Sequence, residues 1–237
     1  MQDDVHNNRD AEVADLLKGA IDLHCHSGPA AMPRILDHHE ALLDAAEAGF
    51  RALLFKDHFY LGVSHCAMLE KLVPTDVKLY SGIALNNASG GINPHAVNHA
   101  ANIGAKIIWL PTLSAANHIA QTEGAAKSFP KTAKKMIDPI PLSALDANGR
   151  VSDETKEVLD IVAEADMILA GGHLPAAELI MVFEEAGKRG VKRKARPVVR
   201  NRRGGRLRRG FLHGGLFRGR GFGLGRSRFR GGGRFGR

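Results

Sequence analysis

The sequence is poor in cysteine and aromatic residues, and it has no long apolar run. Only two cysteines, Cys25 and Cys66, occur among its 237 residues, and a disulfide framework is therefore excluded. No apolar run approaches the ~20 residues that cross a bilayer. The N-terminus also lacks the basic start and apolar stretch of a signal peptide. We therefore expect a cytoplasmic protein with no membrane partner.

Acidic residues are absent from the whole C-terminal stretch, since Glu185 is the last of them. Residues 1–190 carry 16 Lys or Arg and 25 Asp or Glu, a net charge of −9, whereas residues 191–237 carry 17 Lys or Arg and no acid. The overall charge of +8 therefore averages two unlike segments. We predict a globular domain over 1–190 and a disordered, low-complexity tail over 191–237.

The tail has two interpretations. Its 15 Arg, 13 Gly and 5 interleaved Phe are typical of an RGG segment, which neutralises phosphates and stacks bases. On the first interpretation, the chain is an RNA-binding protein. The residues that contact the RNA would then include Arg202, Arg203, Arg206, Arg208 and Arg209. The other is a frameshifted reading frame, because the composition changes inside an expected β/α unit. Either way, such a charge favours nonspecific polyanion binding and leaves homo-oligomerisation open.

The most informative stretch runs from Ile21 to Pro29, with the sequence IDLHCHSGP. It predicts a short strand that ends in His-x-His and then turns. Because strand side chains alternate, His24 and His26 share one face, and Asp22 lies one step deeper on it. Two imidazoles at a strand end can hold a divalent metal. A pair of ordinary loop histidines is the alternative.

Apolar strands alternate with helices over the first 190 residues. The strands are expected near 20–24, 51–56, 77–85, 105–110 and 166–170, and the helices near 9–18, 37–49, 64–72, 94–104, 152–165 and 175–190. A loop with a hairpin is expected over 120–150. This rhythm indicates α/β architecture with a parallel sheet, namely a (β/α)8, TIM-barrel-like fold that is incomplete. A doubly wound sheet is the structural alternative.

Five motifs together resemble the amidohydrolase superfamily. The DLHCHS stretch also resembles the PHP phosphoesterases, although slightly less closely. The five motifs are DLHCHSGP, FKDHF, LNNASGGINPHAV, IWLPT and GGHLP. The resemblance spans about 20–190 and implies a metal-dependent hydrolase with His24, His26 and His173 as ligands. It implies zinc or manganese, and a small-molecule substrate with an amide, ester or lactone bond. The superfamily's sixth-strand histidine and eighth-strand aspartate have no counterpart here, so the chain is expected to be inactive or weakly active.

Further polar residues follow the later strands. Lys56, Asp57 and His58 end the second strand and are candidates for a ligand, a general base or a partner for substrate charge. A solvated turn is the alternative.

The Gly-rich loop after the third strand leads into a helix N-terminus, which suits an anionic substrate group. A plain turn is the alternative. The candidate substrate-binding residues are Asn86, Gly90, Gly91 and Asn93 of this loop, together with Thr112 at the end of the fourth strand.

Five other histidines are interpreted as solvated, although one of them, His118, could line the pocket. They are His38, His39, His95, His99 and His118.

Overall fold

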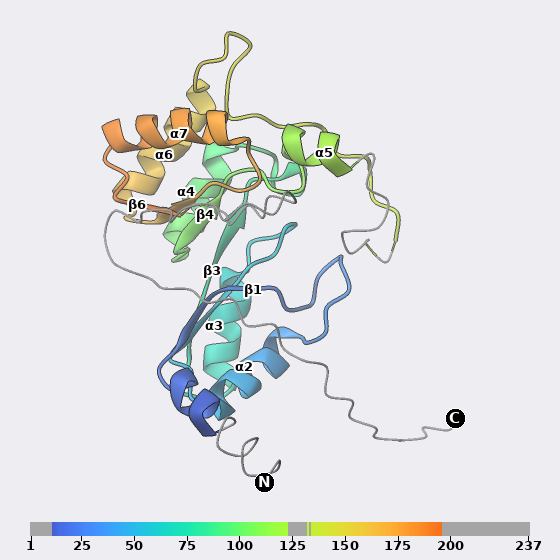
Figure 1. The fold of residues 1–237 in the computed structure, drawn as a ribbon, viewed down its shortest axis with the longest axis vertical. Helices are drawn as coiled ribbons and strands as arrows, with labels where there is room; N and C mark the ends of the chain where they lie inside the picture. The colour runs from blue at the N-terminus through green and yellow to red at the C-terminus, as the bar shows by residue number, and fades with distance from the viewer. Residues whose placement is uncertain (1–10, 123–131, 133, 196–237) are drawn as a thin grey trace.

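The computed structural model describes residues 11–122, 132 and 134–195 (Figure 1). The five arginines expected to contact RNA, like most of the predicted tail, lie outside the described residues. Within the described ranges, no helix is long and apolar enough to cross a membrane.

Six strands form one curled, parallel sheet whose spatial order follows the chain, β1-β2-β3-β4-β5-β6 (Figure 1). The strands are β1 (Ile21–Cys25), β2 (Ala52–Phe55), β3 (Lys78–Ala84), β4 (Ile107–Trp109), β5 (Ile168–Ala170) and β6 (Arg193–Ala195). Because every strand runs the same way, all their carboxyl ends meet at one edge of the sheet. That edge is where barrel enzymes place their active sites.

The helices lie between the strands, and three of them begin at the capping residues that the sequence predicts. A helix over 11–17 leads the described chain. It is followed by α2 (His38–Glu47), α3 (Val63–Leu72), α4 (Pro94–Asn102), α5 (Ala116–Thr122), α6 (Asp153–Glu164) and α7 (Ala176–Lys188), with a 3-10 turn at Asn87–Ser89. Asp37 and Glu40 form a capping box at α2, and Asn93 and Ser152 cap α4 and α6. These helix starts are confirmed.

The two faces of the sheet are covered differently. The outer face packs against the helices in a core that joins strand residues such as Ile108 and Leu169 to helix residues such as Val158 and Val182. The inner face carries a cluster from the strands alone, which includes Leu54, Ile107, Trp109 and Ala170. Helices on one face of a curled parallel sheet are typical of a barrel-like fold, whereas a doubly wound sheet has helices on both faces.

The sheet extends beyond the boundary predicted at residue 190. Residues 190–193 resemble the approach to a sixth strand, but we ended the domain at 190 because no apolar run follows them. Arg193–Ala195 nevertheless pairs with β5, with Ile168 opposite Arg193 and Ala170 opposite Ala195. The pairing uses backbone groups, which any sequence carries. Arg193 is exposed and forms an ion pair with Asp166. An edge strand can therefore form without the apolar pattern of a central one.

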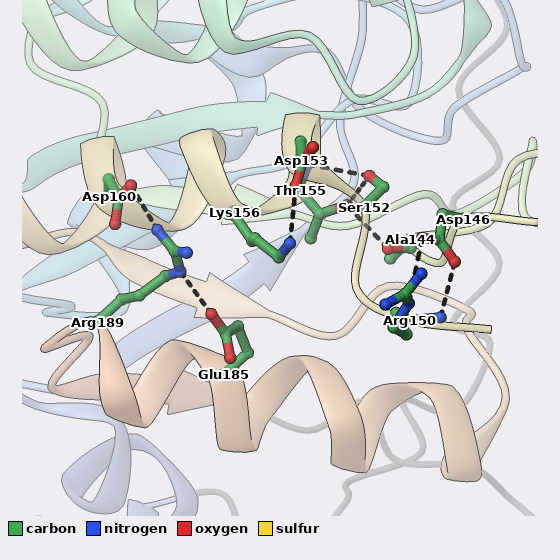
Figure 2. Close-up of polar contacts among 10 residues, drawn as sticks. All are labelled: Ala144, Asp146, Arg150, Ser152, Asp153, Thr155, Lys156, Asp160, Glu185 and Arg189. Atoms are coloured by element: carbon green, nitrogen blue, oxygen red, sulfur yellow. Dashed lines mark hydrogen bonds and ion pairs between the residues drawn. The ribbon is translucent and has the colours of Figure 1, made fainter. Parts of the chain in front are cut away.

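Helices α6 and α7 are joined at the surface by charged side chains (Figure 2). The Arg189 guanidinium donates to Glu185 at 2.7 Å and to Asp160 at 2.6 Å, which connects the end of α7 to α6. At the other end of α6, the hydroxyl of Thr155 donates to the Ala144 carbonyl at 3.0 Å. These contacts hold α6 between the end of α7 and the 144–151 hairpin.

Gly82 of β3 lies opposite Ile107 of β4, and we predict that it tolerates no side chain. A Cβ there would lie 1.8 Å from the carbonyl oxygen of Ile107, so Gly82→Ala must push the strands apart. We expect it to lower the free energy of unfolding by about 3 kcal/mol or more, measured by urea denaturation followed by circular dichroism. Gly187→Ala is the control, because its nearest neighbour is the flexible end of Lys194 at 3.2 Å and alanine favours a helix. Equal stability of the two variants would contradict the prediction.

Candidate metal centre

Histidines from three strand ends lie together at the carboxyl edge of the sheet. The rings of His26 and His58 stack with centroids 5.0 Å apart, and those of His58 and His173 lie 6.2 Å apart. His24 lies 4.9 Å from His26 by the same measure. These residues come from β1, β2 and β5, which are far apart in the sequence. The parallel topology therefore brings together the three predicted ligands and His58.

The His-x-His pair of β1 faces inward, as the alternation predicts. The Nε2 atoms of His24 and His26 are 3.2 Å apart. The Asp22 carboxylate accepts from the backbone N–H of His24 at 2.8 Å, which fixes the strand where the pair begins. The outward-facing Cys25 packs beside the core of α2, β2 and α3.

Lys56 enters the cluster from β2. It is buried, with 3% of its surface exposed, and its Nζ lies 3.4 Å from Nε2 of His24. The same ammonium lies 5.3 Å from the centroid of the Trp109 ring, a distance at which a cation is attracted to an aromatic face. Trp109 is the chain's single tryptophan, so its fluorescence reports on this site.

His58 is held by a buried amide. Its Nδ1 lies 2.8 Å from the hydroxyl of Thr112, which leaves Nε2 for other contacts. The Asn86 amide donates to Thr112 Oγ1 and to the His58 carbonyl, and its oxygen accepts from the backbone N–H groups of Thr112 and Ser114. Asn86 therefore joins the ends of β2, β3 and β4.

His173 is positioned by the turn that precedes it. Gly172 has φ +59°, and a Cβ there would lie 2.2 Å from the carbonyl oxygen of Leu110, so only glycine fits. The backbone N–H of His173 donates to the Pro111 carbonyl at 2.9 Å. Its Nδ1 lies 3.1 Å from Nδ1 of His118. His118 therefore lines the cluster, as one of the two interpretations of this residue predicted.

Desolvation by neighbouring groups favours the neutral form of the clustered imidazoles, including that of His24, whose side chain remains exposed on one side. Desolvation, followed by the charge of Lys56, lowers the pKa of His24 to about 3, of His26 to about 4 and of His58 to about 2. Desolvation, and then His118, lowers the pKa of His173 to about 4. Burial, and secondly the Arg34 guanidinium, lower the pKa of Lys56 to about 8. The cluster therefore presents neutral nitrogen ligands beside an ammonium group at neutral pH.

The pair from β1 fits two ligands of a metal. Two nitrogen ligands of a tetrahedral zinc ion lie about 3.4 Å apart when each Zn–N bond is about 2.1 Å, close to the 3.2 Å between the Nε2 atoms of His24 and His26. A third ligand is not in place: within the described ranges, no group of three or more His, Cys, Asp or Glu side chains is arranged to hold a metal ion. A ring rotation of His58 or His173 would have to complete the set.

The Gly-rich loop after β3, residues 86–93, is held by its own contacts. Gly90 and Gly91 have φ angles of +85° and +75°, and the Asn93 side chain accepts from the N–H groups of His95 and Ala96. The oxygen of Asn93 is therefore engaged in capping α4. Substrate contacts from Asn86, Gly90, Gly91, Asn93 and Thr112 stay a prediction.

His38 corrects one expectation, since we interpreted it as solvated and it is 4% exposed. Its Nδ1 lies 2.5 Å from Ser27 Oγ, its Nε2 lies 2.9 Å from Tyr60 Oη, and its ring stacks on Phe55. The sequence signal was its spacing with the buried Ala41, Leu42 and Ala45, at i+3, i+4 and i+7, which defines the buried face of a helix. By contrast, His39, His95 and His99 are exposed.

Comparisons with known proteins identify a family without an activity. Residues 19–197 match the family described as "Family of unknown function (DUF6282)". No curated protein matches the sequence. A crystal structure of an amidohydrolase from Pseudomonas aeruginosa is similar at a TM-score of 0.44 and 13% identity, covering 77% of this chain and 53% of that chain. The chain therefore spans about half the length of that protein.

Asn86→Ala should loosen both the fold and the site, since it removes a buried amide with four hydrogen bonds. We expect the free energy of unfolding to fall by about 2–4 kcal/mol, measured by urea denaturation. The fluorescence spectrum of Trp109 should shift as well, because the end of β4 loses its anchor. Asn98→Ala, on the exposed side of α4, is the control. A change in stability no larger than that of the control would contradict the role of Asn86.

Stability should fall as the pH is lowered from 7 to 5. An unfolded histidine binds a proton near pH 6.5, whereas the folded chain holds the pKa of His26 and His173 at about 4. Between these values the unfolded state binds more protons, so protonation favours unfolding. The loss begins below about pH 6.5 and grows until the folded pKa is reached. Urea midpoints at pH 7, 6 and 5 measure it, and a constant midpoint would refute it.

Proposed function

This chain belongs to the DUF6282 family, whose function is unknown, and we propose that it is a metal-dependent hydrolase of the amidohydrolase type. The observation that carries the proposal is the cluster of His24, His26, His58 and His173 with Lys56 at the carboxyl edge of a parallel sheet. The motif resemblance described for the sequence points to the same chemistry. The bond cleaved would be an amide, an ester or a lactone, with a phosphoester as the less favoured alternative.

The metal would be zinc, with manganese as the alternative. His24 and His26 would hold it, joined by His173 as the resemblance implies or by His58, whose ring stacks on that of His26. Neutral imidazole is the form that binds zinc. Such an ion supplies Lewis-acid chemistry and lowers the pKa of a bound water to about 7.

The other residues of the site would move protons and stabilise charge. With Nδ1 held by Thr112, His58 can accept a proton at Nε2 when it is not a ligand. The Lys56 ammonium can stabilise the negative charge that develops on a carbonyl oxygen during attack, because a buried charge acts strongly in a site of low dielectric. Asp57, 3% exposed and with Oδ2 lacking a hydrogen-bond partner among the described residues, is a second proton acceptor.

The proposal separates metal binding from turnover. No acidic residue occurs among residues 186–237. Among the described residues at the strand ends, Asp57 or His58 would therefore act as the base. We therefore expect metal binding to be retained and hydrolysis to be slow.

Zinc retention by the full chain tests the proposal. After dialysis against zinc and then metal-free buffer, the wild-type protein should retain about one zinc per chain, measured by plasma mass spectrometry. His24→Ala and His26→Ala should weaken zinc binding by more than about 100-fold, beyond the 10–100-fold typical of losing a supporting residue. His99→Ala is the control, because that histidine is exposed on α4.

Turnover is measured on the zinc-loaded protein with small esters, lactones and amides, and with a phosphoester. Hydrolysis should depend on zinc and should fall by about 100-fold or more in Lys56→Met and His58→Gln, as for loss of a residue that transfers a proton or stabilises charge. Equal zinc retention by wild type and His24→Ala would refute the metal centre. Zinc retention with no zinc-dependent turnover would leave the centre in place and refute the hydrolase.

A further inference from the structure

His173 is held by the first turn of α5, the short helix that follows β4 in the chain. The Asn117 amide donates to the carbonyl of His173 at 3.3 Å, and the Nδ1 atoms of His118 and His173 lie 3.1 Å apart. The backbone N–H of His173 donates to the Pro111 carbonyl at 2.9 Å. Two consecutive residues of one helix therefore contact a single histidine, one through its backbone and the other through its ring.

The first turn of α5 is itself fixed by contacts to the rest of the chain. The backbone N–H of Ala116 donates to the Leu142 carbonyl at 2.9 Å, and the Gln121 amide donates to Oδ1 of Asn117 at 2.9 Å. A helix of seven residues is too short to be stable through its own hydrogen bonds. These contacts therefore set where the His118 ring lies.

The contact between the two rings decides which nitrogen of His173 carries a proton. Two neutral imidazoles that meet at Nδ1 share one proton, because a hydrogen bond needs one donor and one acceptor. If His173 supplies the proton, its Nε2 keeps the lone pair that a metal requires. If His118 supplies it, Nε2 of His173 is protonated and cannot be a ligand.

Nε2 of His173 is available at the edge of the cluster. No described residue forms a hydrogen bond with it, and unlike Nδ1 of His26 this nitrogen is not buried. The ring lies beside that of His58, at 6.2 Å between centroids. The nitrogen that His118 does not contact therefore belongs to the candidate metal centre.

We propose that His118 is a positioning residue of this centre, whose Nδ1 accepts the Nδ1 proton of His173 and so leaves the lone pair of His173 Nε2 for the metal. Histidines that bind metals commonly donate their other ring N–H to such an acceptor, and loss of the acceptor weakens metal binding by about 10–100-fold. The inference rests on the proposed function for the metal and goes beyond it in giving α5 a role. The same contact fixes the tautomer of His173 in the metal-free protein.

The tautomer of His173 in the full chain, in EDTA and at neutral pH, tests the assignment. Isotopically labelled histidine gives ring nitrogen signals in NMR spectra that separate a protonated nitrogen from an unprotonated one, and His173→Gln identifies the signals of this residue. The wild-type protein should show a protonated Nδ1 and an unprotonated Nε2. A proton on Nε2 of His173 in the wild type would overturn the proposal.

Variants separate the ring contact from a general structural role. His118→Leu removes the acceptor and should abolish the preference for a proton on Nδ1 of His173, whereas His118→Asn offers a carbonyl oxygen and should restore it. Asn117→Ala removes the neighbouring contact, leaves the ring pair in place and should keep the wild-type tautomer. An unchanged tautomer in His118→Leu would overturn the assignment.

Zinc affinity, measured by competition with a coloured chelator, connects the contact to the metal centre. His118→Leu should bind zinc about 10–100-fold more weakly than wild type, and His118→Asn should recover most of this loss. His99→Leu is the control, because that histidine is exposed on α4.

The two measurements distinguish this inference from the proposed function. If the wild-type protein binds zinc and His118→Leu binds it equally well, the role of His118 is refuted and the metal centre stands. If the wild-type protein binds no zinc, the metal centre is refuted, and the tautomer of His173 still decides whether His118 accepts its proton.

Discussion

The parallel alignment of the six strands is the constraint on which the remaining features depend. Since all six strands run the same way and neighbours in the sheet are neighbours in the chain, each strand delivers its last residues to the same edge. Histidines separated by up to 149 positions, from His24 to His173, reach one cluster in this way. The amide of Asn86 then ties three of those strand ends together, so the positions of the site residues are coupled to the register of the sheet.

The same arrangement concentrates polar groups at one edge of the sheet. His24, His26, His58 and His173 have lowered pKa values there, and Lys56 is 3% exposed. Groups of this kind oppose folding unless they are paired, so their presence together indicates use rather than stability. A metal would replace the contact that the Nε2 atoms of His24 and His26 make with each other.

The sequence predicted the parts of this structure that local rules govern. Helix starts followed from single capping residues such as Asp37, Asn93 and Ser152, and the inward direction of His24 and His26 followed from strand alternation. Only the approach to the sixth strand, at residues 190–193, was recognised, because the pairing of this strand uses backbone groups, which have no compositional signature. The helical spacing of His38 relative to Ala41, Leu42 and Ala45 indicated that its side chain is buried. We interpreted it as solvated because histidine is polar.

The closure of residues 28–37 on their own backbone has an evolutionary consequence. Because the hydrogen bonds at the base of the loop involve Gly28, Leu36 and His38, the residues between them can change without altering the register of β1. The histidines are fixed by the sheet, whereas residues 29–35 belong to a loop that closes on its own backbone. This loop can therefore change in sequence while the histidines keep their positions at the sheet edge.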